Sequence, residues 1–73
     1  MSRRYFHPEP KDLERCIAAW LRHDALPQQP AQRLCRAYLV DGRRLCIELQ
    51  NNAGVLATFS VTPKRVTRLS TAE

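Results

Sequence analysis

The side chains of this sequence best suited to catalysis are those of His7, His23, Cys16, Cys35 and Cys46. Nucleophilic catalysis needs a general base beside the nucleophile. His7 stands in a proline-flanked segment, whereas His23 stands beside Asp24 near the expected end of a helix, where an imidazole suits the helix dipole. The pattern places no serine or cysteine next to either histidine. We therefore predict that the chain is not an enzyme and assign it no catalytic residues.

The three cysteines do not form a metal-binding motif. A structural zinc site takes four ligands, and the intervals between positions 16, 35 and 46 are long. Cys35 and Cys46 are expected on one face of a sheet, and Cys16 on a helix that covers the other face. An odd number of cysteines also argues against a secreted disulfide scaffold. We expect reduced thiols in a cytoplasmic protein without metal or cofactor.

Positive charge is the most prominent chemical feature of the chain. Lys and Arg number 12 against 7 for Asp and Glu, which gives a net charge of +5 over 73 residues. An excess of this kind attracts phosphate groups or acidic protein surfaces. The hydrophobic fraction of 44% argues against disorder. The length predicts one small domain over residues 1–73, and we expect neither a membrane helix nor a secretory signal.

The first half of the chain predicts an arm and a helix. Pro8 and Pro10 indicate an extended arm over residues 1–9, which Tyr5 and Phe6 are expected to anchor on the domain. Apolar residues then recur at helical spacing and predict an amphipathic helix over residues 10–25. Its apolar face comprises Leu13, Ile17, Trp20 and Leu21, and its basic face comprises Lys11, Arg15 and Arg22.

The second half predicts a β-meander over residues 33–70. Asp41-Gly42 separates two strand-like runs and predicts a two-residue type I′ turn, which pairs Val40 with Arg43. In that register the helix-covered face carries Leu34, Tyr38, Val40, Leu45, Ile47 and Leu49, with Arg36 as a misfit.

The third strand should turn Val55, Ala57, Phe59 and Val61 inward. This requires an odd loop of three or five residues before it, with a positive φ or a bulge at Gly54, and it pairs Leu45 with Phe59. Residues 64–70 are expected to form a fourth, edge strand. The predicted fold class is α+β, with an N-terminal helix packed on a three- to four-stranded antiparallel meander.

Two surfaces of this fold are candidate binding sites. The first is a cationic end, because a meander brings its first and third turns together: Arg43, Arg44, Lys64 and Arg65, with Arg68 further along the edge strand. These charges suit a phosphate backbone or an acidic protein, or they simply solvate and protect an edge. The second is the face opposite the helix, expected to be apolar and therefore a protein interface: Leu39 and Leu56, with Cys35, Ala37 and Cys46.

Two resemblances add to this interpretation. Residues 38–45, Tyr-Leu-Val-Asp-Gly-Arg-Arg-Leu, resemble the first hairpin of Sm-like barrels, although those barrels have five strands and only four fit here. In length and Arg-rich basic composition the chain is similar to small bacteriophage regulators that bind host RNA polymerase. That resemblance implies a polymerase subunit as partner, the N-terminal part of β′, with inhibition of initiation and antitermination in the bacterial cytoplasm. The alternative is a small basic nucleic-acid-binding protein. No small-molecule substrate is expected.

Overall fold

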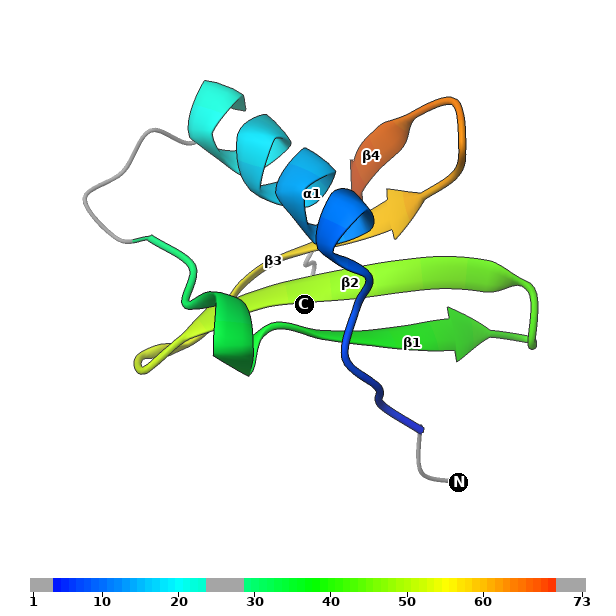
Figure 1. Cartoon of the computed structure of the whole chain (residues 1–73), viewed down its shortest axis with the longest axis horizontal. Helices are drawn as coiled ribbons and strands as arrows, with labels where there is room; N and C mark the ends of the chain where they lie inside the picture. The colour runs from blue at the N-terminus through cyan, green and yellow to red at the C-terminus, as the bar shows by residue number, and fades with distance from the viewer. Residues whose placement is uncertain (1–3, 24–28, 70–73) are drawn as a thin grey trace.

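The structure, a computed structural model, describes residues 4–23 and 29–69. Its elements are α1 (Pro10–His23), the 3-10 turn η1 (Gln32–Leu34), β1 (Arg36–Val40), β2 (Arg44–Asn51), β3 (Gly54–Val61) and β4 (Val66–Leu69). The strands form one antiparallel sheet in the order β1-β2-β3-β4, and α1 crosses one face of it (Figure 1). The predicted α+β arrangement is confirmed.

Helix α1 begins at Pro10, as predicted, and its buried stripe consists of Leu13, Cys16 and Trp20. The spacing of these residues, three and then four, follows one side of a helix. Cys16 was expected beside the apolar face but is fully buried at its centre, whereas Leu21 is 48% exposed. The last two residues of the predicted helix, 24 and 25, lie outside the described residues.

The β1–β2 hairpin differs from the prediction by one residue. Asp41 and Gly42 adopt positive φ values of 56° and 68°, as a type I′ turn requires. The Arg43 N–H donates to the Val40 carbonyl oxygen at 3.1 Å, but Val40 pairs with Arg44. Arg43 is therefore an additional turn residue, and the predicted Val40–Arg43 pair is wrong.

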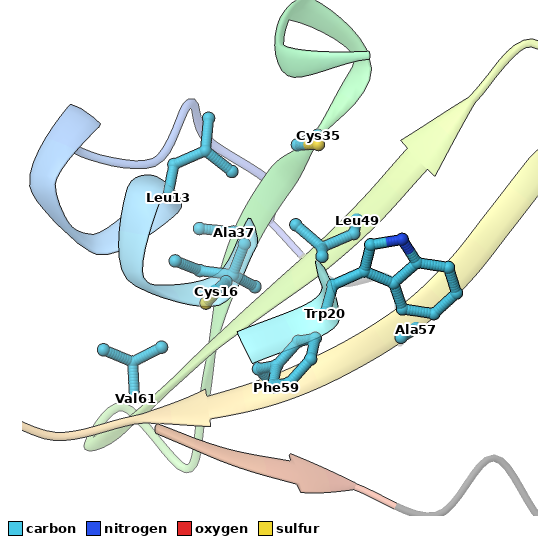
Figure 2. Packing of buried hydrophobic residues seen from close by; sticks show 10 residues of the cluster. Leu13, Cys16, Trp20, Cys35, Ala37, Leu49, Ala57, Phe59 and Val61 are labelled. Atoms are coloured by element: carbon cyan, nitrogen blue, oxygen red, sulfur yellow. The ribbon is translucent and has the colours of Figure 1, made fainter. Parts of the chain in front are cut away.

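This one-residue shift inverts both faces of β1, because strand side chains alternate with a period of two. Cys35 and Ala37 are buried against α1, although they were expected on the opposite face (Figure 2). Tyr38 instead pairs with Cys46 on the face away from the helix. The expectation that Leu34, Tyr38 and Val40 face the helix is wrong, and Arg36 is not a misfit of the core.

The β2–β3 connection does not have the odd number of loop residues that was expected. Asn51 pairs with Gly54, so the loop has two residues, and the register shifts between Leu49 and Gln50. Gly54 has the expected positive φ, 124°. The bulge turns Ala57, Phe59 and Val61 inward as predicted, but it leaves Val55 52% exposed. Phe59 pairs directly with Ile47, and Leu45 pairs with Val61, so the expected Phe59–Leu45 pairing is wrong.

One hydrophobic core lies between α1 and the sheet. Trp20 projects from the helix over the strands and is 3% exposed (Figure 2). The strands contribute mainly Ile47, Leu49 and Phe59, and β4 closes the sheet at the edge where a fourth strand was predicted. This core fixes how the helix lies against both edges of the sheet, and thus positions the candidate surfaces.

Candidate functional site

The cationic residues of the predicted end lie around the turn between β3 and β4. That turn and the β1–β2 turn lie at the same end of the sheet, as a meander requires (Figure 1). Arg43 and Arg44 line a hollow together with Thr62 and Pro63. Lys64 and Arg65 line a different, adjoining hollow, on the side of the turn that faces α1. The structure thus divides the predicted cluster into two pairs.

The second hollow contains two residues of the predicted basic helix face. It is lined by Arg15 and Arg22 of α1 and by Lys64 and Arg65 of the turn, and we call these four residues the cationic hollow. The other lining residues are small or apolar: Ala18, Ala19 and Val66.

Hydrogen bonds hold the two sides of the cationic hollow together. Arg15 Nη2 donates to the Thr62 carbonyl oxygen at 2.8 Å, and Arg15 Nη1 lies 3.5 Å from Asp12 Oδ1. The turn itself is closed between Thr62 and Arg65, whose N–H groups donate to Arg65 O at 2.9 Å and Thr62 Oγ1 at 3.0 Å. The backbone that carries Lys64 and Arg65 is therefore fixed relative to α1.

Among residues 4–23 and 29–69, no neighbouring acid neutralises the charge in this hollow. No carboxylate lines it among the residues that the structure describes, and within residues 4–23 and 29–69 the side chains of Arg22, Lys64 and Arg65 make no ion pair. Asp12, on the same helix, forms its ion pair with Arg15. Three cations consequently face solvent close together.

Arg68, the fifth cation of the predicted site, has a structural contact. It pairs with Phe59 across the sheet, and its guanidinium carbon lies 5.6 Å from the centre of the Trp20 ring. A cation over an indole face is a favourable interaction. Arg68 therefore packs against the helix beside the core rather than extending the cationic hollow.

At the opposite edge of the sheet, the N-terminal arm lies along β1. Phe6 and Ala37 exchange two backbone hydrogen bonds, of 2.9 and 2.8 Å. Tyr5 packs edge-on against Tyr38 with ring centres 5.6 Å apart, and the Arg36 guanidinium lies 3.7 Å from the centre of the Tyr5 ring. Tyr5 and Phe6 thus attach the arm to the sheet, as the sequence indicated.

Arg36 connects this edge to the second strand. Its Nε donates to Glu48 Oε1 at 2.9 Å, and Gln50 Nε2 donates to the same oxygen at 3.1 Å. Glu48 is buried, with 7% exposure, so its carboxylate needs such donors. Arg36 and Glu48 at the β1 edge therefore stabilise the fold.

Large apolar side chains are exposed along the same edge. Of the six in the described part of the chain, four belong to the arm, to η1 or to β1, and we call them the apolar rim: Tyr5, Phe6, Leu34 and Leu39. The predicted interface residue Leu39 is 48% exposed, but it pairs with Leu45 and so lies on the helix-bearing face. The second predicted interface residue, Leu56, is half-buried against the core. The expectation that Cys35, Ala37 and Leu39 lie opposite the helix is therefore wrong, because the register shift moved them to the helix-bearing face, whereas Cys46 lies on the expected side.

Within the described residues, the outer edge of β1 is only partly paired with the arm. The N–H and C=O groups of Ala37 point toward Phe6, so by the two-residue repeat of a strand those of Leu39 point toward the same edge. Among residues 4–23 and 29–69, Leu39 has no backbone partner there. Leu39 thus combines an exposed apolar side chain with edge backbone groups that have no partner in the described part of the chain.

The cysteines are core residues. Burial is the main cause that raises the pKa of Cys16 to about 12; the charge of Asp12 raises it further, and Arg15 opposes this. Burial also raises the pKa of Cys35, whose Sγ lies 3.4 Å from the Ala31 carbonyl oxygen. Cys35 faces the helix and Cys46 the other side of the sheet, so their expected proximity on one face is wrong.

The other groups considered for chemistry lie apart. In the described ranges, no three His, Cys, Asp or Glu side chains are grouped so that they could hold a metal ion. His7 is exposed in the arm, His23 is the last residue of α1, and Asp24 lies outside the described residues.

Comparison of the chain with protein families, curated proteins and solved structures finds no match. Within the described residues, no helix is long and apolar enough to cross a membrane.

Proposed function

We propose that this chain is a small non-enzymatic regulator that binds a host protein assembly through its β1 edge. The assembly is bacterial RNA polymerase, and binding inhibits or redirects transcription. The observation that supports this proposal is the apolar rim: of the six exposed large apolar side chains among residues 4–23 and 29–69, four belong to the arm, η1 or β1, and within those ranges Leu39 has no backbone partner at the β1 edge.

An edge of this kind suits a protein partner for two physical reasons. Exposed large apolar side chains at a sheet edge are candidates for an interaction site, and apolar anchors that become buried carry most of the binding energy at protein interfaces. An open strand edge also accepts an extended segment of a partner through main-chain hydrogen bonds. Leu39 combines both properties, so we assign it the role of anchor.

The choice of polymerase rests on the resemblance in length and basic composition to phage regulators of transcription. A net charge of +5 favours association with an acidic surface. By the same resemblance, the expected partner segment lies in the N-terminal part of the β′ subunit. The expected consequences are fewer initiation events at promoters and more transcription through terminators.

The proposal can be tested with purified bacterial RNA polymerase and a template that carries a promoter and a terminator. We expect the chain to bind the enzyme, to reduce promoter-dependent transcripts and to increase read-through. Leu39→Asp should weaken binding by at least about tenfold, because it places a charge in an apolar contact.

Leu21→Asp is the matched control, since Leu21 has the same 48% exposure as Leu39 but lies on α1. It should bind polymerase as the unsubstituted chain does. Equal binding by both variants, or no binding of polymerase by the unsubstituted chain, would contradict the proposal.

A further inference from the structure

We propose that the cationic hollow is a docking site for the phosphate backbone of double-stranded nucleic acid. This site differs from the β1 edge in position and in chemistry, and it does not depend on the identity of the protein partner. It includes Arg15 and Arg22, two residues of the predicted basic helix face.

The first argument is preorganisation. The bond from Arg15 Nη2 to the Thr62 carbonyl oxygen joins α1 to the turn that carries Lys64 and Arg65. Arg22 lies on the same helix as Arg15, two turns further along, and lines the same hollow. The backbone positions that carry the cations are therefore held together by the fold before any ligand binds, which lowers the ordering cost of binding.

The second argument is charge. Arg22, Lys64 and Arg65 have no ion-pair partner among the described residues, and no acid of the described chain lines the hollow. Like charges held close together repel one another, so a polyanion that neutralises them gains energy beyond that of isolated pairs. Duplex DNA offers a phosphate charge about every 1.7 Å along its axis, which matches a compact group of cations.

The third argument concerns what the hollow lacks. Its other lining residues are Ala18, Ala19 and Val66, and they include no aromatic ring on which an unpaired base could stack. They also include no large exposed apolar anchor of the kind that protein interfaces use. Contacts to phosphates alone suit a duplex, whose bases stay stacked, and they confer no sequence preference.

Arg43 and Arg44 lie on the other side of the β3–β4 turn, next to Thr62 and Pro63. Asp12 also lines the hollow that contains Arg43 and Arg44, so their positive charge is partly offset there. We therefore assign these two residues to a secondary contact that strengthens binding without defining the site.

The test is the salt dependence of binding between the full chain and a short labelled duplex, measured by fluorescence anisotropy between about 50 and 200 mM salt. Three phosphate contacts predict a slope of log K against log salt of about −2.7, and the secondary contact would steepen it. Substituting Arg22→Gln, Lys64→Gln and Arg65→Gln together should remove most of this slope and weaken binding at least about tenfold.

The matched control neutralises three exposed cations elsewhere, Arg4→Gln, Lys11→Gln and Arg33→Gln, and so has the same net charge. It should keep the slope of the unsubstituted chain. The melting temperatures of both variants show that each is folded. Equal losses in the two variants, a slope shallower than about −1, or stronger competition by a single strand or by polyglutamate than by unlabelled duplex would each overturn the proposal.

Discussion

The two edges of the sheet use their charged residues in opposite ways. At the β1 edge, Arg36 is bound to Glu48 and stacked on Tyr5, while apolar side chains stay exposed. At the other edge, Arg22, Lys64 and Arg65 lack ion-pair partners in the described chain, while Trp20 beside them is buried. The comparison teaches that a cation beside β1 stabilises the fold, whereas most cations around the β3–β4 turn do not and are available to a ligand.

The core supports both edges, so its loss has the largest expected effect. Trp20→Ala removes the largest side chain between α1 and the sheet and should lower the free energy of unfolding by about 3–5 kcal/mol. A domain of this size has little more stability than that, so we expect extensive unfolding. Urea denaturation followed by circular dichroism measures the change. Leu21→Ala, on the exposed side of the same helix, should stay within about 0.5 kcal/mol. Similar transitions in both variants would show that Trp20 does not anchor the helix.

The buried thiol of Cys16 makes this shared core sensitive to alkaline pH. Burial raises the pKa of Cys16 from 9.0 to about 12, so between these values the unfolded chain releases a proton that the folded chain keeps. Stability from this group is complete below pH 9 and falls by about 1.4 kcal/mol per pH unit as the pH rises toward 12. Denaturation curves measured across this range should show that the free energy of unfolding falls more steeply with pH for the unsubstituted chain than for Cys16→Ala. Parallel pH profiles would contradict the assignment.

At the β1 edge, removal of a single cation should destabilise the protein. Arg36→Ala leaves the buried Glu48 carboxylate without one of its donors and removes the contact to Tyr5, so we expect a loss of about 1 kcal/mol. The arm should also detach more readily, which limited proteolysis can detect. Arg33→Ala, an exposed cation close by in η1, serves as the comparison and should change neither measurement. If both variants behave alike, Arg36 has no structural role.

At the cationic edge, the corresponding substitutions should have the smallest effect on stability. Lys64→Gln together with Arg65→Gln should change the free energy of unfolding by no more than about 0.5 kcal/mol, because neither side chain has an ion-pair partner in the described chain. Removing mutual repulsion predicts a slight gain rather than a loss. Chemical denaturation at low salt measures this change in the free energy of unfolding. A loss larger than that of Arg36→Ala would remove the distinction between the two edges.

The sequence predicted the elements and the main core residues because their signals are local. Helical spacing identified Trp20, strand alternation identified Ile47 and Phe59, and the positive φ of Gly54 followed from the need to correct the register. Which side chains of β1 face the helix could not be predicted from local signals. Asp41-Gly42 permits a turn with or without an additional residue, and Arg43 alone decides which side of β1 faces the helix.

The candidate surfaces depend on tertiary placement and were therefore predicted only in part. The meander topology brings the turns that carry Arg43 and Lys64 to one end of the sheet, and this follows from strand order alone. The inclusion of Arg15 and Arg22 requires knowing how α1 lies across the sheet, which no local pattern specifies. The available signal was that basic residues occur both on one helix face and in the turn that carries Lys64.

The central claim is that the two edges bind different partners, and a crossed binding measurement tests it most directly. Leu39→Asp and the triple variant Arg22→Gln, Lys64→Gln and Arg65→Gln are each titrated with purified bacterial RNA polymerase and with duplex DNA at one salt concentration. We predict that the leucine variant loses polymerase but binds the duplex normally, whereas the triple variant loses the duplex but keeps polymerase. A variant that loses both partners while remaining folded, or losses in the reverse pattern, would contradict the account.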